Sequence, residues 1–96
     1  MRIVGGRFRG KKLSAPAGLS TRPTTDRLRE TVFNVLQHAY GDPVDGARVL
    51  DLFAGTGAIG LEALSRGAKF TLFVEESAGA RGVLRENAET LGQIGI

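Results

Sequence analysis

One run of twelve residues, 49–60, constrains the fold of this chain more than any other feature of its sequence. It reads Val-Leu-Asp-Leu-Phe-Ala-Gly-Thr-Gly-Ala-Ile-Gly, an apolar stretch followed by three glycines spaced G-x-G-x-x-G. This order predicts a buried strand, a tight turn and the start of a helix, where parallel α/β proteins hold nucleotide-like ligands. Gly55 and Gly57 permit backbone conformations and close approach that a Cβ blocks, and Gly60 lets the helix lie tightly on the strand.

By itself the glycine spacing is compatible with NAD, FAD, S-adenosylmethionine or a turn without any ligand. Two acids near the turn narrow this choice. Asp51 lies inside the expected strand, where an unpaired carboxylate is costly, so it needs a partner such as the ammonium of a bound methionine moiety. Glu75 follows Gly55 by 20 residues, at the end of a second apolar run, where a carboxylate takes both hydroxyls of a ribose. The alternative is a tight turn beside two solvated acids.

The pattern after residue 47 alternates between strands and helices. We expect strands over 48–53 and 69–75, and helices over 58–66 and 77–91, which together indicate a parallel α/β sheet. Parallel sheets are covered by helices on both faces, and two strands are too few for that. We therefore expect the N-terminal half of a larger domain, either a truncated gene product or a piece of one, that is only marginally stable alone.

Positive charge is concentrated near the N-terminus. Residues 1–30 hold eight basic and two acidic side chains, a balance of +6, whereas residues 31–96 hold five basic and eight acidic ones, a balance of −3. This asymmetry predicts contact with a polyanion, and a merely solvated basic surface is the alternative. Residues 2–14 suggest a hairpin that turns at one of its glycines, with Phe8 anchoring it to the core. Its exposed arginines and lysines suit RNA.

A helix is expected after the loop at residues 15–23. Thr24, Thr25 or Asp26 is a candidate cap. The face expected to pack on the core consists of Leu28, Val32, Val35, Leu36 and Ala39. Polar side chains that can donate hydrogen bonds gather near the helix start: Arg22, Thr24, Thr25, Arg27 and Arg29. We expect this cluster to bind a phosphate or a ligand carboxylate, and an ordinary capped helix start is the alternative.

Several classes of protein are disfavoured. The chain has no cysteine, which excludes a disulfide framework and cysteine-based zinc sites, and we assign no metal ligand. Its start does not resemble a leader peptide, and no apolar run approaches the roughly 20 residues of a membrane helix. We expect a cytoplasmic protein that does not bind membranes. The only histidine, His38, is expected to be a partly exposed helix residue.

Three segments together resemble the bacterial 16S ribosomal RNA guanine-N2 methyltransferase family of the RsmD type, essentially end to end. They are residues 2–6 (Arg-Ile-Val-Gly-Gly), residues 21–34 (Thr-Arg-Pro-Thr-Thr-Asp-Arg-Leu-Arg-Glu-Thr-Val-Phe-Asn) and the glycine turn with its helix at 51–68. The most specific part is Arg-Pro-Thr-Thr-Asp-Arg at 22–27, because the glycine turn is shared by many methyltransferases.

The resemblance implies a fold, a cofactor and a partner. The fold is an α/β, Rossmann-like class I S-adenosylmethionine-dependent methyltransferase fold with a truncated parallel sheet; residues 1–23 are a basic β-hairpin and loop for rRNA, and residues 24–96 are half of the cofactor-binding domain. The implied cofactor-binding residues are Asp51, Ala54, Gly55, Thr56, Gly57 and Glu75. The implied contacts to 16S rRNA, or to a small-subunit assembly intermediate, are Arg2, Arg7, Arg9, Lys11, Lys12, Arg22, Thr24, Thr25, Arg27 and Arg29.

The chain departs from the family by an absence. Related enzymes position the target amine with an Asn/Asp-Pro-Pro-aromatic motif, and the only prolines here, Pro16, Pro23 and Pro43, do not form one. We therefore predict no catalytic residue and no activity for this chain by itself. Two other functions stay open: an RNA-binding fragment without chemistry, and a fragment of an NAD(P)-dependent oxidoreductase.

Overall fold

The computed structural model describes residues 1–15 and 23–92, and in the first helix it describes side chains from Asp26 onward. The elements are α1 (Pro23–Ala39), β1 (Arg48–Leu52), α2 (Ala58–Ser65), β2 (Phe70–Val74) and α3 (Ala78–Thr90). The strands pair in parallel, with Asp51 opposite Phe73. The expected α/β alternation is therefore confirmed, and from β1 onward each element ends within one residue of its predicted boundary. No helix in this part of the chain is long and apolar enough to cross a membrane.

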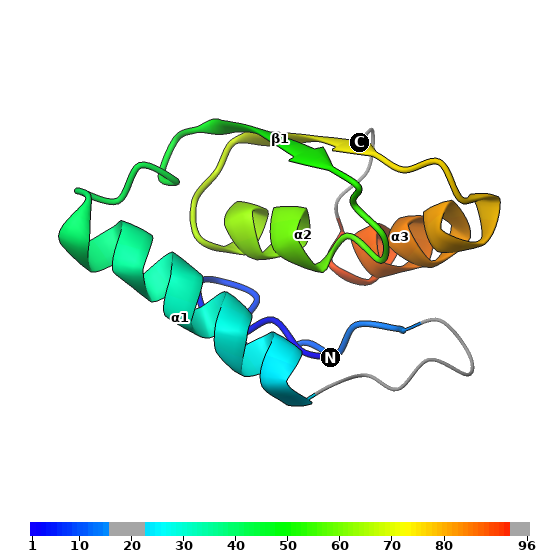
Figure 1. Ribbon diagram of the computed structural model, residues 1–96, viewed down its shortest axis with the longest axis horizontal. Coiled ribbons are helices and arrows are strands. Elements are labelled where there is room, and N and C mark those ends of the chain that lie inside the picture. The colour runs from blue at the N-terminus through cyan, green and yellow to red at the C-terminus, as the bar shows by residue number, and fades with distance from the viewer. Residues whose placement is uncertain (16–22, 93–96) are drawn as a thin grey trace.

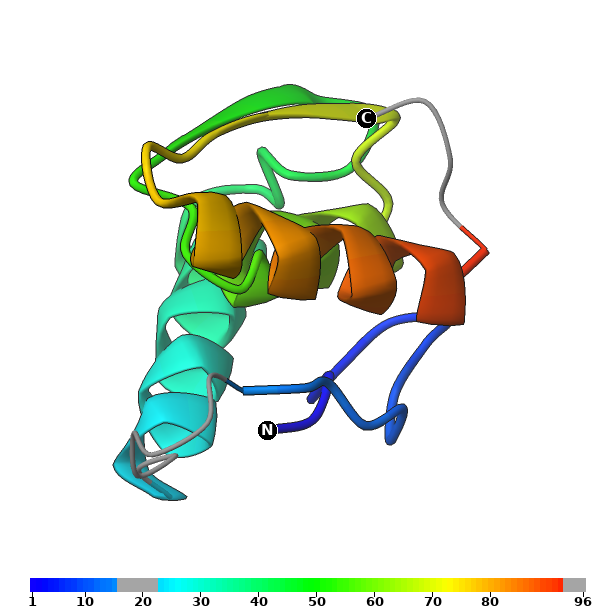
Figure 2. The same cartoon turned by 90° about the vertical axis from the view of Figure 1, so that its right-hand side faces the viewer.

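Helices cover only one face of the two-stranded sheet. Figures 1 and 2 show α2 and α3 on the same side of the sheet, and the N-terminal segment beyond α2. Thr71 on the helix side is fully buried, whereas Leu50 and Leu72 on the other side are 59% and 50% exposed. The prediction of a buried β1 is thus wrong, because successive side chains of a strand point to opposite faces and no described element covers the second face.

The N-terminal segment folds back on itself but forms no regular strands. One antiparallel bridge joins Arg2 to Lys12, and the Leu13 N–H donates to the Met1 carbonyl at 2.8 Å. The predicted hairpin is therefore reduced to a single bridge closed by turns. Ile3 and Leu13 enter the core, and Phe8 packs against that core, which confirms its anchoring role.

Buried Glu62 on α2 holds the N-terminal segment in place. Its Oε1 accepts from the Val4 N–H at 3.0 Å and from Arg29 Nε at 3.1 Å. Its Oε2 accepts from the Gly5 N–H at 2.9 Å and from Arg66 Nε at 2.8 Å. A carboxylate has about four acceptor positions, so Glu62 is saturated. One buried acid therefore fixes the N-terminal segment and α1 on α2.

Helix α1 differs from the prediction in two respects. It begins at Pro23, a residue type favoured in the first turn, so the three cap candidates, residues 24–26, follow the first helical residue instead of preceding it. Part of its expected core-facing side is exposed, with Leu28 at 65%, Val32 at 46% and Val35 at 48%, whereas Leu36 packs against the core as expected.

The face of α1 that is buried instead carries Arg29 and Phe33. The reason is electrostatic, because Arg29 must reach Glu62, and Arg66 lies over the Phe33 ring at 5.2 Å. These contacts rotate α1 by about one residue from the orientation that hydrophobicity alone predicts. Two of the exposed apolar side chains of α1, Leu28 and Val32, line a groove of about 370 Å³ against α2 and β1.

Candidate functional site

The glycine turn connects β1 to α2 as predicted. The Ala54 N–H donates to the Val74 carbonyl at 2.9 Å, which extends the strand pairing by one bond, and the Gly57 N–H closes the turn on the Ala54 carbonyl at 2.9 Å. Gly57 caps α2 in the left-handed conformation with φ 85°, and no side chain caps the helix. The start of α2 thus faces the carboxyl ends of both strands, where parallel α/β sheets bind ligands.

Glycine is needed at each of the three positions of the turn for a different physical reason. A Cβ on Gly57 would overlap Leu84 Cδ1 of α3, and a Cβ on Gly60 would overlap the side chains of Phe73 and Thr71 on β2. Gly60 therefore allows the predicted close packing of helix on sheet. Gly55 also has positive φ, 57°, but the space beside it is open. A ligand can consequently approach the backbone at Gly55.

The half-buried carboxylate of Asp51 binds the start of α2. Its Oδ2 accepts from the Gly60 N–H at 3.0 Å. Burial raises the pKa of Asp51, and the hydrogen bond from Gly60 opposes that rise. The partner that Asp51 needs is thus a backbone N–H, and this N–H at the start of α2 is not free to bind a ligand. The single hydrogen bond still leaves this carboxylate with unused acceptor positions.

Glu75 binds the other end of the same turn. Its Oε1 accepts from the Gly55 N–H at 2.7 Å, and its Oε2 accepts from the Ser77 N–H at 2.9 Å. The Ser77 N–H, followed by the Gly55 N–H, lowers the pKa of Glu75, so the carboxylate is ionised at neutral pH. Glu75 lies two residues beyond Phe73, the partner of Asp51 in the register. Both acids therefore belong to the helix-covered face of the sheet and meet at one turn.

Sequence reasoning missed Asn87, which joins this turn to the N-terminal segment. Its buried side chain donates to the Thr56 carbonyl at 2.9 Å and to the Ser14 carbonyl at 3.1 Å, and accepts from the Ser14 N–H at 2.6 Å. The sequence did contain a signal for a buried amide, because Asn87 lies on the same helical face as Leu84, Ala88 and Leu91, which are all buried. Glu62 within the apolar α2 gave the same kind of signal.

The predicted RNA-contacting residues divide into three groups. Those with exposed side chains are Arg2, Arg7, Arg9, Lys11, Lys12 and Arg27. Arg29 is 1% exposed and paired with Glu62 and Asp26, so its expected place on the surface is wrong. The physical reason is that buried Glu62 requires compensating donors. Arg22 and the side chains of Thr24 and Thr25 lie outside the described residues.

Comparison with known proteins gives a consistent result. A family model described as conserved hypothetical protein 95 matches residues 1–95. Ribosomal RNA small subunit methyltransferase D of Escherichia coli K12 is 47% identical over 91 residues, which are 95% of this chain and 44% of that protein. The protein of the same name from Haemophilus influenzae Rd is 41% identical over 91 residues, 95% of this chain and 45% of that one.

A solved structure, that of the protein yhhF from E. coli, superposes with a TM-score of 0.80 at 48% identity, covering 96% of this chain and 48% of that chain. The chain therefore spans about half the length of the curated relatives that it matches.

Proposed function

The chain belongs to the family described as conserved hypothetical protein 95, and on this premise we propose that it holds the S-adenosylmethionine site of an enzyme that methylates the N2 amine of a guanine in 16S rRNA. Relatives named as rRNA small subunit methyltransferases support methylation of rRNA as the activity. The nature of the cofactor and of the target amine is the proposal.

The arrangement of acids at the glycine turn carries this proposal. Each oxygen of Glu75 accepts one backbone hydrogen bond, from Gly55 and from Ser77, and a weaker contact with the Glu76 N–H also lowers its pKa; acceptor capacity remains for the hydroxyls of a ribose. Burial raises the pKa of Asp51 by penalising its charged form, so the ammonium of a methionine moiety would relieve the cost of burying that charge. The open space at Gly55 admits the ligand between them. When bound, the cofactor supplies an electrophilic methyl group.

The cofactor-binding residues named in the sequence analysis contact different parts of the cofactor in this proposal. We assign Asp51 to the ammonium, Glu75 to the ribose, and Ala54, Gly55, Thr56 and Gly57 to the backbone cradle. Asn87 positions the cradle, because it holds the Thr56 carbonyl. The exposed cations of the N-terminal segment would take RNA phosphates.

The 96 residues supply binding but not the positioning of the reacting amine. The lone pair of an exocyclic guanine amine is delocalised into the ring, so the amine needs acceptors for its hydrogens and a stacked ring. No Asn/Asp-Pro-Pro-aromatic sequence exists here to provide them. We therefore propose that this chain binds cofactor and RNA without transferring the methyl group by itself.

Titration calorimetry of the chain with S-adenosylmethionine and, separately, with NADH tests the proposal. We expect binding of the methyl donor and none of NADH. Binding of NADH alone would favour an oxidoreductase fragment and overturn the proposal. If the folded chain binds RNA but neither cofactor, the RNA-binding fragment without chemistry is the correct function.

A further inference from the structure

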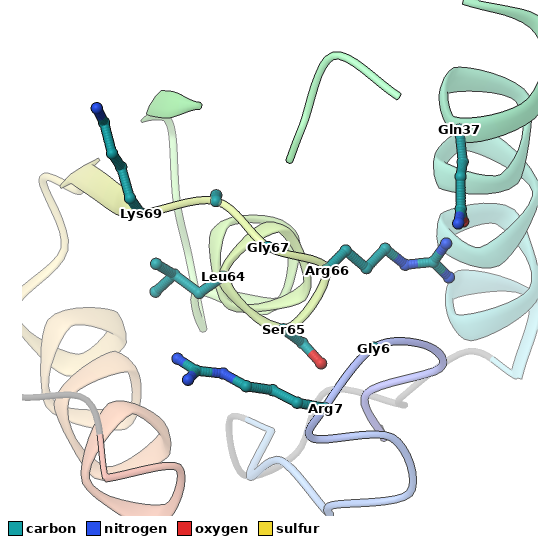
Figure 3. A pocket seen from close by; sticks show the side chains of 9 residues that line it. Gly6, Arg7, Gln37, Leu64, Ser65, Arg66, Gly67 and Lys69 are labelled. Atoms are coloured by element: carbon teal, nitrogen blue, oxygen red, sulfur yellow. The ribbon is translucent and has the colours of Figure 1, made fainter. Parts of the chain in front are cut away.

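A second hollow lies at the opposite end of α2 from the glycine turn. It measures about 550 Å³ and opens between the turn of the N-terminal segment, α1 and the start of β2. The N-terminal segment contributes Arg7, α1 contributes Gln37, and the end of α2 with the residues after it contributes Ser65, Arg66 and Lys69. Figure 3 shows Arg66 directed toward Gln37 on α1, with Arg7 and Lys69 on the other side of the α2 end.

The charge of this hollow is positive. Three of its lining residues are cations and none is acidic. Two acids lie next to lining residues without lining the hollow themselves: Glu62 pairs with Arg66, and the Asp45 carboxylate lies against Gly67. The carbonyl groups that end α2 are already used, since Ser65 accepts from the Arg7 N–H at 2.9 Å and Leu64 from the Gly67 N–H at 3.3 Å. A ligand therefore meets donors and positive charge.

Not all of these donors are occupied. Arg66 is committed to Glu62 through Nε and to Asn34 through Nη1. By contrast, the side chains of Arg7, Gln37 and Lys69 have no hydrogen bond or ion pair with any part of the chain that the structure describes; Arg7 only stacks on the Phe8 ring, at 4.6 Å. Three side chains with unengaged donors, from three separate segments, thus line the hollow, and their ends lie apart on two sides of the α2 end (Figure 3).

We propose that this hollow binds phosphate groups of the RNA backbone, with Lys69, Arg7 and Gln37 as the contacting side chains. RNA fits better than a small anion because Arg7 belongs to the same N-terminal segment as three further exposed cations, Arg9, Lys11 and Lys12. The N-terminal segment runs alongside α2, whose eight residues span about 12 Å. It ends beside the glycine turn, where the Ser14 N–H donates to Asn87. The identity of the ligand as RNA rests on the proposed function.

Charge reversal with a matched control tests this site. Lys69→Glu changes the hollow, and Arg85→Glu makes the same change of charge at an exposed position of α3. Binding of a short RNA hairpin is measured by fluorescence anisotropy over a range of salt concentrations. We expect Lys69→Glu to weaken binding about tenfold and to lower the salt slope by about 0.7–0.9, the contribution of one phosphate contact, and Arg85→Glu to change binding less than twofold.

Equal effects of Lys69→Glu and Arg85→Glu would overturn the proposal, because they would show unspecific attraction only. Lys69→Ala, with thermal unfolding as a check of folding, gives the same comparison without a new charge. Inorganic phosphate forms a second arm: if it competes with RNA at millimolar concentration, the site is a small-anion site and the RNA proposal fails. Each variant should bind S-adenosylmethionine as tightly as wild type. If wild type does not bind S-adenosylmethionine, the proposed function fails, but the comparison of RNA binding between the variants still tests this site.

Discussion

Glu62 and Glu75 bind backbone N–H groups in similar ways, but at two regions of the molecule that differ in burial. Glu62, facing the N-terminal segment, is fully buried and accepts four hydrogen bonds. Glu75, at the glycine turn, is partly exposed and accepts two. The first acid has no acceptor position left and serves structure alone, whereas the second holds the turn and retains capacity for a ligand. Burial and the number of donors therefore separate a structural carboxylate from the one that we propose binds the cofactor.

The largest effect should come from Glu62→Gln. The amide places an NH₂ group against a backbone or guanidinium donor and leaves Arg29 and Arg66 without their buried charge partner, which costs about 3–5 kcal/mol. Urea unfolding followed by circular dichroism measures the loss. Glu89→Gln on the exposed face of α3 is the control and should change stability by less than about 0.5 kcal/mol. Equal midpoints for the two variants would contradict the structural role of Glu62.

A smaller loss is expected from Gly57→Ala at the turn. The left-handed conformation costs an alanine about 1–2 kcal/mol, and overlap of its Cβ with Leu84 adds about 1–3 kcal/mol. Gly46→Ala separates the two causes, since Gly46 has φ 75° and open space around it. The difference between the unfolding free energies of the two variants should be the cost of overlap. If the two variants are equally stable, α3 does not pack against the turn as described.

The pH dependence of stability should reveal Glu75. Its pKa is lowered by folding, so its contribution is present above its ordinary value of 4.5 and is lost as the pH falls through the lowered value. The stability difference between wild type and Glu75→Gln should therefore be largest near neutral pH and disappear in strong acid. A difference that stays constant from neutral pH to strong acid would show that the charge of Glu75 does not hold the turn.

The smallest effect on stability is expected from Asp51→Asn. Folding raises the pKa of Asp51, so its ionised form costs stability above that pKa, and the cost is relieved as the pH falls. The asparagine oxygen can still accept from the Gly60 N–H, so the variant should be as stable as wild type at neutral pH, or slightly more stable. A loss of more than about 1 kcal/mol in urea unfolding would indicate that the charge of Asp51 stabilises the fold without a ligand.

The sequence predicted the elements whose pattern is local. The glycine turn, the strands, and the helices α2 and α3 follow from residue spacing, and Asp51 and Glu75 were found because acids follow or interrupt apolar runs. The orientation of α1 was not predictable in this way, because it depends on Arg29 reaching Glu62, 33 residues away. Asn87 was missed for the same reason, since its partners Thr56 and Ser14 are distant in the sequence. Long-range satisfaction of buried polar groups thus decided what hydrophobic periodicity could not.

The most direct test of the central claim is titration calorimetry of S-adenosylmethionine into wild type, Glu75→Gln and the neighbouring Glu76→Gln. Glu75→Gln replaces a charged acceptor by a neutral amide with a single acceptor oxygen, so it should bind about 10-fold to 100-fold more weakly than wild type. Glu76→Gln should bind like wild type, because its side chain is exposed and belongs to no contact of the turn. Equal affinities of Glu75→Gln and Glu76→Gln in folded protein, or no binding by folded wild type, would contradict the assignment of the glycine turn as the cofactor site.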